Sequence, residues 1–318
     1  LRTTRGESFS GTAKEDTSPA GACQIAPYTL PAVATDSIRA QDLKQVMNRY
    51  LSRLREHRES LNRLNVYPVP DGDTGTNMSL TMESVVGALD GASSLSDVAQ
   101  GMAHGSLMGA QGNSGIILSQ ILRAWAEVFR GHQGVGPGEF AEGLERATTA
   151  AYKAVGNPVE GTILTVLRAT ADEARQASGA HGALAGMLER VYDRAEKALL
   201  ETPELLPVLK AAGVVDAGGA GLLLLLACLH EHVGGAKVTL PPAFFKPAAQ
   251  LMSGDGHAKE GGSIADLHYE VMFMLEGAPG ADERLKDAWS RIGDSIVIVG
   301  GEGAWKCHIH TDDIGAAL

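Results

Sequence analysis

The chain has 318 residues, of which 44% are hydrophobic and 20% are charged, so it is long enough for two domains with buried cores. Its formal net charge of -11 at pH 7 argues against nucleic acid or an anionic membrane surface as the main partner, because both are negatively charged. The 3 cysteines are widely spaced and odd in number, which excludes a disulfide scaffold and suits the reducing cytoplasm.

Residues 1–35 mix Arg, Ser, Thr, Gly and Pro without the apolar centre of a signal peptide, so we expect a flexible leader. Helical patterns then follow one another over residues 36–233, which predicts an all-α domain. The expected helix starts are Asp36, Asn77, Leu95, Ser114, Pro137, Gly161, Ala180, Glu204 and Gly219. The longest apolar run, residues 222–229, is far shorter than the roughly 20 residues of a membrane span, so it predicts a buried helix and no transmembrane segment.

The loop after the first expected helix reads VYPVPDGDTGTNM over residues 66–78 and holds two carboxylates. Its prolines fix φ, so the chain enters the loop extended, while its glycines let backbone amides approach a ligand. Asp71 and Asp73 can converge on one Mg²⁺ ion, which prefers a few carboxylates together with phosphate oxygens and water. Thr76 or Asn77 is expected to cap the following helix, whose amino end would favour phosphate.

Two other interpretations of this loop compete with a metal and phosphate site. A calcium loop is excluded because, counted from Asp71, its sixth and twelfth positions hold Thr76 and Met82 instead of Gly and Glu. A simple Asp-Gly turn is the second alternative. The second carboxylate, the second glycine and the flanking prolines favour the ligand site.

A second loop, GAQGNSG over residues 109–115, precedes another apolar helix and suits phosphate oxygens for the same reason. The Walker A motif is excluded because no Lys followed by Ser or Thr comes after the glycines, and the esterase nucleophile elbow is excluded because Ile116 replaces its second glycine. Alone, this loop is consistent with a simple helix cap. The Asp71–Asp73 loop, this loop and residues 160–162 and 215–219 together give four helix starts that could surround a nucleotide at one end of a bundle.

The composition turns to Gly, Pro, Ala and Ser over residues 234–264, which predicts a linker. A small α+β domain is expected over residues 265–318, with strands at 269–275, 295–299 and 305–310 and a helix at 282–292. One more helix is expected to begin at residues 312–315, so we expect this domain to be incomplete.

His308 and His310 lie on the same face of the last expected strand, at a spacing compatible with a transition metal. Glu270 or His268 could supply a third ligand. A solvent-facing pair of histidines is an equally weighted alternative. Cys307 points to the opposite face and is expected to pack in the core.

Three motifs together resemble those of the bacterial fatty acid kinase catalytic subunit: LNVYPVPDGDTGTNM at 64–78, GNSG at 112–115 and DAGG at 216–219. The amino-terminal domain of that family is similar to the ATP-binding domain of dihydroxyacetone kinase. The resemblance covers about residues 36–233 and implies an eight-helix barrel that binds ATP or ADP with Mg²⁺ at one end. Residues 295–311 resemble the family's middle domain, and a further carboxy-terminal domain of the family has no counterpart in this sequence.

The resemblance implies that Asp71 and Asp73 bind Mg²⁺. Asn65 stands where dihydroxyacetone kinases have a third Asp, so the resemblance leaves open whether a second Mg²⁺ ion is bound. The family's middle domain can bind zinc through one Cys and two His; His308 and His310 match the histidines, and Glu270 occupies the Cys position. The residues that the resemblance assigns to the nucleotide pocket are Thr74, Gly75, Thr76, Asn77, Asn113, Ser114, Thr162, Ile163, Asp216, Ala217 and Gly218.

The preferred hypothesis is therefore transfer of a phosphoryl group from ATP to a fatty acid carboxylate that an acyl-binding partner protein presents. A carboxylate is deprotonated at neutral pH and needs no general base, which fits the lack of an obvious catalytic His in the helical motifs. No catalytic residue is assigned beyond the metal-binding and phosphate-binding residues of these motifs. The alternatives are a phosphotransferase of the dihydroxyacetone kinase type and a nucleotide-binding regulatory or adaptor protein without turnover. A homodimer is one option for the oligomeric state, which the sequence leaves open.

Overall fold

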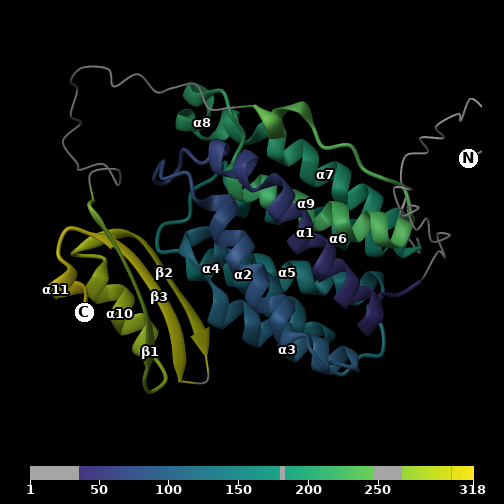
Figure 1. The fold of residues 1–318 in the computed structure, drawn as a ribbon, viewed down its shortest axis with the longest axis horizontal. Helices are drawn as coiled ribbons and strands as arrows, with labels where there is room; N and C mark the ends of the chain where they lie inside the picture. The colour runs from purple at the N-terminus through teal and green to yellow at the C-terminus, as the bar shows by residue number, and fades with distance from the viewer. Residues whose placement is uncertain (1–35, 180–182, 247–266, 302) are drawn as a thin grey trace, which may run out of the picture. The chain divides into compact units, whose positions relative to one another are not determined.

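The computed structural model describes residues 36–179, 183–246, 267–301 and 303–318 (Figure 1). The predicted leader lies outside these residues, as does most of the predicted linker. The helical part contains α1 (Ala40–Leu64), α2 (Thr74–Ala88), α3 (Leu95–Gly109), α4 (Gly112–Phe129), α5 (Pro137–Ala154), α6 (Ile163–Ser178), α7 (Leu184–Leu205), α8 (Pro207–Ala212), α9 (Ala217–Gly234) and the short 3₁₀ helix η1 (Pro242–Phe245).

The longer helices form a closed ring within the described part of the chain. Each helix from α1 to α7 packs against the next in chain order, α9 packs against α7, and α9 also packs against α1. The short α8 lies beside α7 and takes no place in this ring. The expected eight-helix barrel is thus confirmed, and its connections are short because consecutive helices are neighbours.

Apolar periodicity explains why these helices pack as they do. One face of α1 is buried, including Leu43, Met47, Tyr50 and Leu54, whereas the charged residues of this helix lie on the other face. By contrast, α9 is apolar nearly all round and contacts α1, α2, α6 and α7. Among the described helices, only α9 is long and apolar enough to cross a membrane. However, 78% of this 18-residue helix is buried inside the protein. The prediction of a buried helix over residues 222–229 is confirmed.

Several helix starts differ from those expected. The first helix begins at Ala40 rather than Asp36, because Ile38 pairs with Val135 through the hydrogen bonds Ile38 N to Val135 O (2.9 Å) and Val135 N to Ile38 O (2.8 Å). The described part of the expected linker is also packed. Phe244 of η1 is fully buried, and its ring lies against the His57 ring of α1 with the two centroids 5.4 Å apart.

The last part of the chain is a small α+β unit with β1 (Tyr269–Glu276), α10 (Ala281–Trp289), β2 (Gly293–Gly301), β3 (Ala304–Thr311) and α11 (Ile314–Ala317). The sheet is antiparallel in the order β1-β3-β2, so the predicted mainly-α class with a small α+β part is confirmed. Trp289 covers one face of the sheet, with its ring 5.3 Å from that of Phe273. Cys307 is fully buried on this face, as expected, so His308 and His310 lie on the other face.

The other face of the sheet meets the barrel beside the loop between α5 and α6. Gly156 N donates to Ile296 O of β2 at 2.9 Å, and Lys286 Nζ of α10 donates to Lys153 O at 3.1 Å. Val297 and Val299 pack with apolar residues at the start of α4 and the end of α5. These contacts bring the histidine-bearing face of the sheet to the end of the barrel where the sequence motifs lie.

The position of α9 in the core can be tested by truncating one of its leucines. Leu224 is fully buried, whereas Leu200 of α7 is 46% exposed. We expect Leu224→Ala to lower the free energy of unfolding by about 2–5 kcal/mol because it leaves a cavity. Leu200→Ala, as the control, should lower it by about 0.5 kcal/mol or less. Urea unfolding of both variants makes this comparison, and equal losses would contradict the packing described here.

Candidate functional site

A pocket lies between the barrel end and the sheet, and it gathers most of the motifs singled out above. The α1–α2 segment lines it with Asn65, Tyr67, Pro68, Val69, Asp71, Asp73, Thr74 and Asn77. The start of α4 adds Gly112, Asn113, Ser114 and Ile117, the α5–α6 segment adds Val155, Asn157, Val159, Thr162, Ile163 and Leu164, and the start of α9 adds Asp216 and Gly218. The sheet unit contributes Glu270, Asp294, Ser295, Ile296, Val297, His308 and His310. Four helix starts therefore meet around one cavity.

Asp71 and Asp73 form the acidic centre of this pocket. Asn65 Nδ2 donates to Asp71 Oδ1 at 2.5 Å and lies 3.5 Å from Asp73 Oδ1, while Asn77 Nδ2 donates to Asp73 Oδ2 at 2.7 Å. Burial and the charge of Asp73 raise the pKa of Asp71 to about 7. Two carboxylates that repel each other in this way form a suitable binding site for a cation. In this arrangement Asn65 presents N–H donors to both carboxylates and so helps to hold them together.

The start of α2 is held by the neighbouring helix. Asn62 Oδ1 of α1 accepts hydrogen bonds from Gly75 N at 2.8 Å and Thr76 N at 3.2 Å. The predicted cap by Thr76 or Asn77 is therefore wrong: the helix begins at Thr74, and a side chain from α1 satisfies its first N–H groups. Gly75 and Thr76 face α1 and do not line the pocket, unlike Thr74 and Asn77.

The start of α4 lies directly against α2. Gly112 has φ +53°, and a Cβ at this position would meet the Asn77 side chain, so only glycine allows this close approach. Asn113 Oδ1 is buried and has no hydrogen-bond partner among the described residues. A buried polar atom in this state at the edge of a pocket is one that a bound ligand can satisfy.

Asp216 closes the opposite side of the pocket and caps α9. It is 5% exposed, and its Oδ2 accepts from Gly219 N at 2.7 Å. Burial raises its pKa to about 6, although N–H groups of Gly219 and Ile163 work in the opposite direction. Gly218 lies against Ile163, whereas Ala217 is buried in the core and does not line the pocket.

The sheet residues predicted as zinc ligands lie side by side in the same pocket. His308 Nδ1 is 3.1 Å from Glu270 Oε1, and the rings of His308 and His310 have centroids 4.9 Å apart. The expected alternative of a solvent-facing pair is wrong, because these histidines are 1% and 7% exposed. His268 lies elsewhere and pairs with Asp312 at 2.7 Å.

The described residues give no support to the zinc prediction. Among them, no three His, Cys, Asp or Glu side chains form a group that could hold a metal ion. Instead, the hydrogen bond with His308 lowers the pKa of Glu270, and burial lowers the pKa of His310. A Mg²⁺ ion needs fewer protein ligands, because phosphate oxygens and water complete its coordination.

Comparison with known proteins assigns the family. The DAK2 domain model matches residues 68–231, and the model of the FakA-like middle domain of fatty acid kinase matches residues 266–318. The chain belongs to the DAK2 domain family. It is a kinase-related subunit in which a DAK2 domain precedes a middle domain of the fatty acid kinase type.

Curated relatives match more than four fifths of this DAK2 protein. Protein YloV of Bacillus subtilis is 36% identical over 276 residues, which cover 83% of this chain and 50% of the relative. An uncharacterised protein of Staphylococcus saprophyticus is 35% identical over 271 residues, covering 82% of this chain and 49% of the relative. One from Staphylococcus aureus strain USA300 is 35% identical over 268 residues, covering 81% and 48%. The chain thus spans about half the length of the curated relatives it matches.

Some residues that shape the DAK2 pocket were not predicted. Asn62 gave no signal because it lies on the polar side of α1, as many solvated residues do. Asp294 and Ser295 line the pocket where the pairing of β2 with β3 shifts register, and Ser295 has φ 52°. The alternation of apolar and polar residues along a strand does not reveal such a bulge. The position of Asp294 directly before the expected strand at 295–299 was a usable hint that it belongs to the site.

The burial of Asp216 predicts a pH-dependent stability. Its folded-state pKa of about 6 lies above the ordinary value of 3.8, so the native state holds the proton more tightly than the unfolded chain does. Its contribution to stability is complete below about pH 4 and is lost as the pH rises through about 6. The Asp216→Asn variant has no charge to bury and should lack this dependence.

Urea unfolding of the wild type and Asp216→Asn across this range measures the effect. The free energy of unfolding of the wild type minus that of the variant should fall by about 2–3 kcal/mol between about pH 4 and about pH 7, because each pKa unit corresponds to roughly 1.4 kcal/mol. Titration of Asp71 occurs in both proteins and cancels in this difference. A difference that does not change with pH would contradict the buried position of Asp216.

Proposed function

We propose that this DAK2 protein is the catalytic subunit of a cytoplasmic fatty acid kinase, which uses ATP and Mg²⁺ to phosphorylate a fatty acid carboxylate held by an acyl-binding partner protein. The observation that carries the proposal is the convergence of the Asp71–Asp73 pair with the starts of α2, α4, α6 and α9 around one pocket. Carboxylates for a cation and helix amino ends for phosphate are the two requirements of a nucleotide–magnesium site.

The residues present fit a nucleotide with Mg²⁺. The raised pKa of Asp71 reflects desolvation and repulsion from the charge of Asp73, and a divalent cation would relieve this repulsion. Gly112 leaves no room for a side chain at the start of α4, and the unpartnered Asn113 Oδ1 lies beside it. When bound, Mg²⁺ would neutralise charge on the phosphate oxygens.

The proposed role of the protein is positioning and charge stabilisation. Asp71 and Asp73 would hold the cation, and Asn65 and Asn77 would keep both carboxylates in place through the hydrogen bonds described above. Ser114 and Asn113 would hold phosphate from the start of α4. The acceptor carboxylate oxygen would form the new bond to phosphorus while the bond to the ADP oxygen breaks, so no proton has to be removed.

The match of residues 266–318 to a fatty acid kinase-type middle domain supports the acyl acceptor over a small ketone. The same comparison supports an acyl-binding partner, since the matched domain belongs to one subunit of such a kinase. The position of Glu270, Asp294 and His310 in the pocket wall supports a place for the sheet beside the reacting groups.

Replacement of the acidic pair tests the proposed function. With an acyl-binding partner, fatty acid and ATP, the wild type should form ADP and an acyl phosphate. Asp71→Asn and Asp73→Asn should each reduce this rate at least about a hundredfold, because the phosphate charge loses its cation site. Asp90→Asn, which alters an exposed carboxylate just after α2, is the control and should retain full activity.

Other outcomes of this assay separate the alternatives. Phosphorylation of a ketone carried by a partner, and not of a fatty acid, would identify a dihydroxyacetone kinase-type enzyme. Binding of ADP with no product from either acceptor would identify a regulatory nucleotide-binding protein. Mg²⁺-dependent nucleotide binding that survives both substitutions would show that the metal lies elsewhere.

A further inference from the structure

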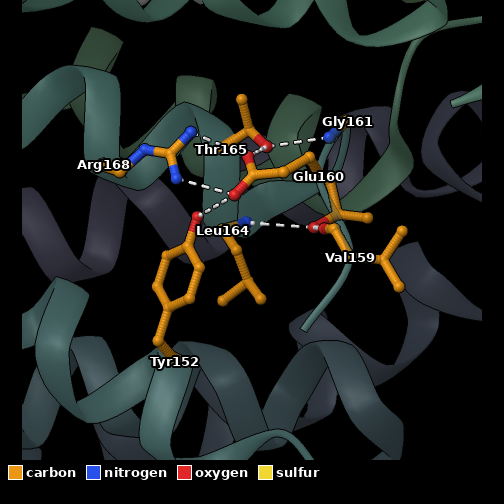
Figure 2. A network of polar contacts seen from close by, with 8 residues as sticks. Tyr152, Val159, Glu160, Gly161, Leu164, Thr165 and Arg168 are labelled. Carbon is orange, nitrogen blue, oxygen red and sulfur yellow. Dashed lines mark hydrogen bonds and ion pairs between the residues drawn. The ribbon is translucent and has the colours of Figure 1, made fainter. Parts of the chain in front are cut away.

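Glu160 is the centre of a polar network (Figure 2). It is not among the residues that line the pocket. Its carboxylate accepts hydrogen bonds from Tyr152 Oη of α5 at 3.0 Å and from Thr165 Oγ1 of α6 at 2.5 Å. Arg168 of α6 adds two parallel bonds of 2.7 and 2.8 Å, one to each oxygen. These four residues are called the Glu160 clamp below.

The protonation states in the clamp suit this arrangement. Burial and the nearby Glu160 raise the pKa of Tyr152 to about 12, so its hydroxyl stays a donor at neutral pH. Burial alone would raise the pKa of Glu160, but the bonds from Thr165, Arg168 and Tyr152 outweigh it and lower this pKa. The clamp therefore has an ionised acceptor and three donors, which is the strongest form of such a network.

The clamp is joined to the backbone of the pocket wall through Thr165. Its Oγ1 accepts a hydrogen bond from Gly161 N at 2.8 Å while it donates to Glu160 (Figure 2). Gly161 has φ +85°, and a Cβ there would lie 2.7 Å from Leu206 Cβ. The backbone next to Glu160 is thus fixed both by the clamp and by a position that only glycine can fill.

The residues that follow carry this constraint into the pocket. Thr162 Oγ1 donates to Val159 O at 2.8 Å and accepts from Leu164 N at 3.4 Å, so the turn is closed from within. Val159, Thr162 and Leu164 all line the pocket, as does Ile163, whose N–H bonds to Asp216. A shift of the Glu160 backbone would move this whole wall.

Stability alone gives little reason for such a network. The side chains of Glu160 and Arg168 are 44% and 48% exposed, and ion pairs in contact with water contribute little to folding because water screens them. What the clamp does fix is geometry, because two helices and one loop converge on a single carboxylate.

We infer that Glu160 is a positioning residue. It holds the pocket wall formed by Val159, Thr162, Ile163 and Leu164 in the position that the bound nucleotide requires. Glu160 is outside the pocket lining and acts through the loop and not by contact with the ligand. The inference rests on the proposed nucleotide site.

The test compares Glu160→Gln with a matched control in the full chain. Glu173→Gln removes the charge of another glutamate that pairs with an arginine on a neighbouring helix, Arg190 at 2.6 Å, and Glu173 does not line the pocket. Calorimetric titration with ADP and Mg²⁺ gives Kd, and thermal unfolding gives Tm without nucleotide. We expect Glu160→Gln to raise Kd about tenfold, the equivalent of about one charge-assisted hydrogen bond, with Glu173→Gln unchanged.

Tyr152→Phe provides a second, milder variant in case Glu160→Gln does not fold. It removes one hydroxyl and keeps the ring, so it should raise Kd about threefold, because one weaker bond is lost. If both clamp variants bind ADP as tightly as the wild type, whatever their Tm, the positioning role is wrong while the proposed nucleotide site stands. If the wild type itself fails to bind ADP, the proposed function is wrong, and the role inferred for Glu160 is wrong with it.

Discussion

Asp71 and Asp73 hold two carboxylates side by side at the start of α2, and most of the site can be understood from the charge they bring together. Asn65 and Asn77 donate to them, Asn62 satisfies the helix end behind them, and Gly112 lets α4 approach on the other side. Burial and the repulsion between the two carboxylates raise the pKa of Asp71, and a bound cation would relieve this repulsion. The neighbouring helix starts then provide the positive ends that phosphate prefers.

The barrel makes this convergence possible. Because each long helix packs against the next and α9 closes the ring onto α1, helix starts that are far apart in sequence meet at one end. The sheet unit completes the enclosure through β2, whose Ile296 O accepts from Gly156 N beside the α5–α6 loop. That loop is therefore held by the sheet on one side and by the Glu160 clamp on the other, and it forms the pocket wall between them.

Much of the fold could be predicted from the sequence. The apolar periodicity of the helices and the alternation in residues 305–310 gave the elements and the fold class, since both depend on local spacing. Helix ends were less predictable: α1 begins later than expected because Ile38 pairs with Val135, and α2 begins earlier because Asn62 supplies its cap. Both causes are contacts between segments distant in sequence, which a local pattern cannot contain.

The site was predictable in part for the same reason. Asp71, Asp73, Ser114 and Asp216 stood in loops whose composition pointed to ligands, and they do line one pocket. The direction of side chains was not predictable. Gly75 and Thr76 face α1 and not the pocket. The predicted zinc ligands Glu270 and His308 pair with each other, in the same pocket as the Asp71–Asp73 pair. Their joint position depends on how the sheet packs on the barrel.

The most direct test of the central claim is a crystal structure of this chain with ADP and Mg²⁺. The account predicts an ion bound by Asp71 and Asp73, phosphate oxygens at the start of α4 beside Asn113 and Ser114, and the nucleoside near Ile163 and Asp216. An ion bound away from both aspartates, or a nucleotide outside this pocket, would contradict it.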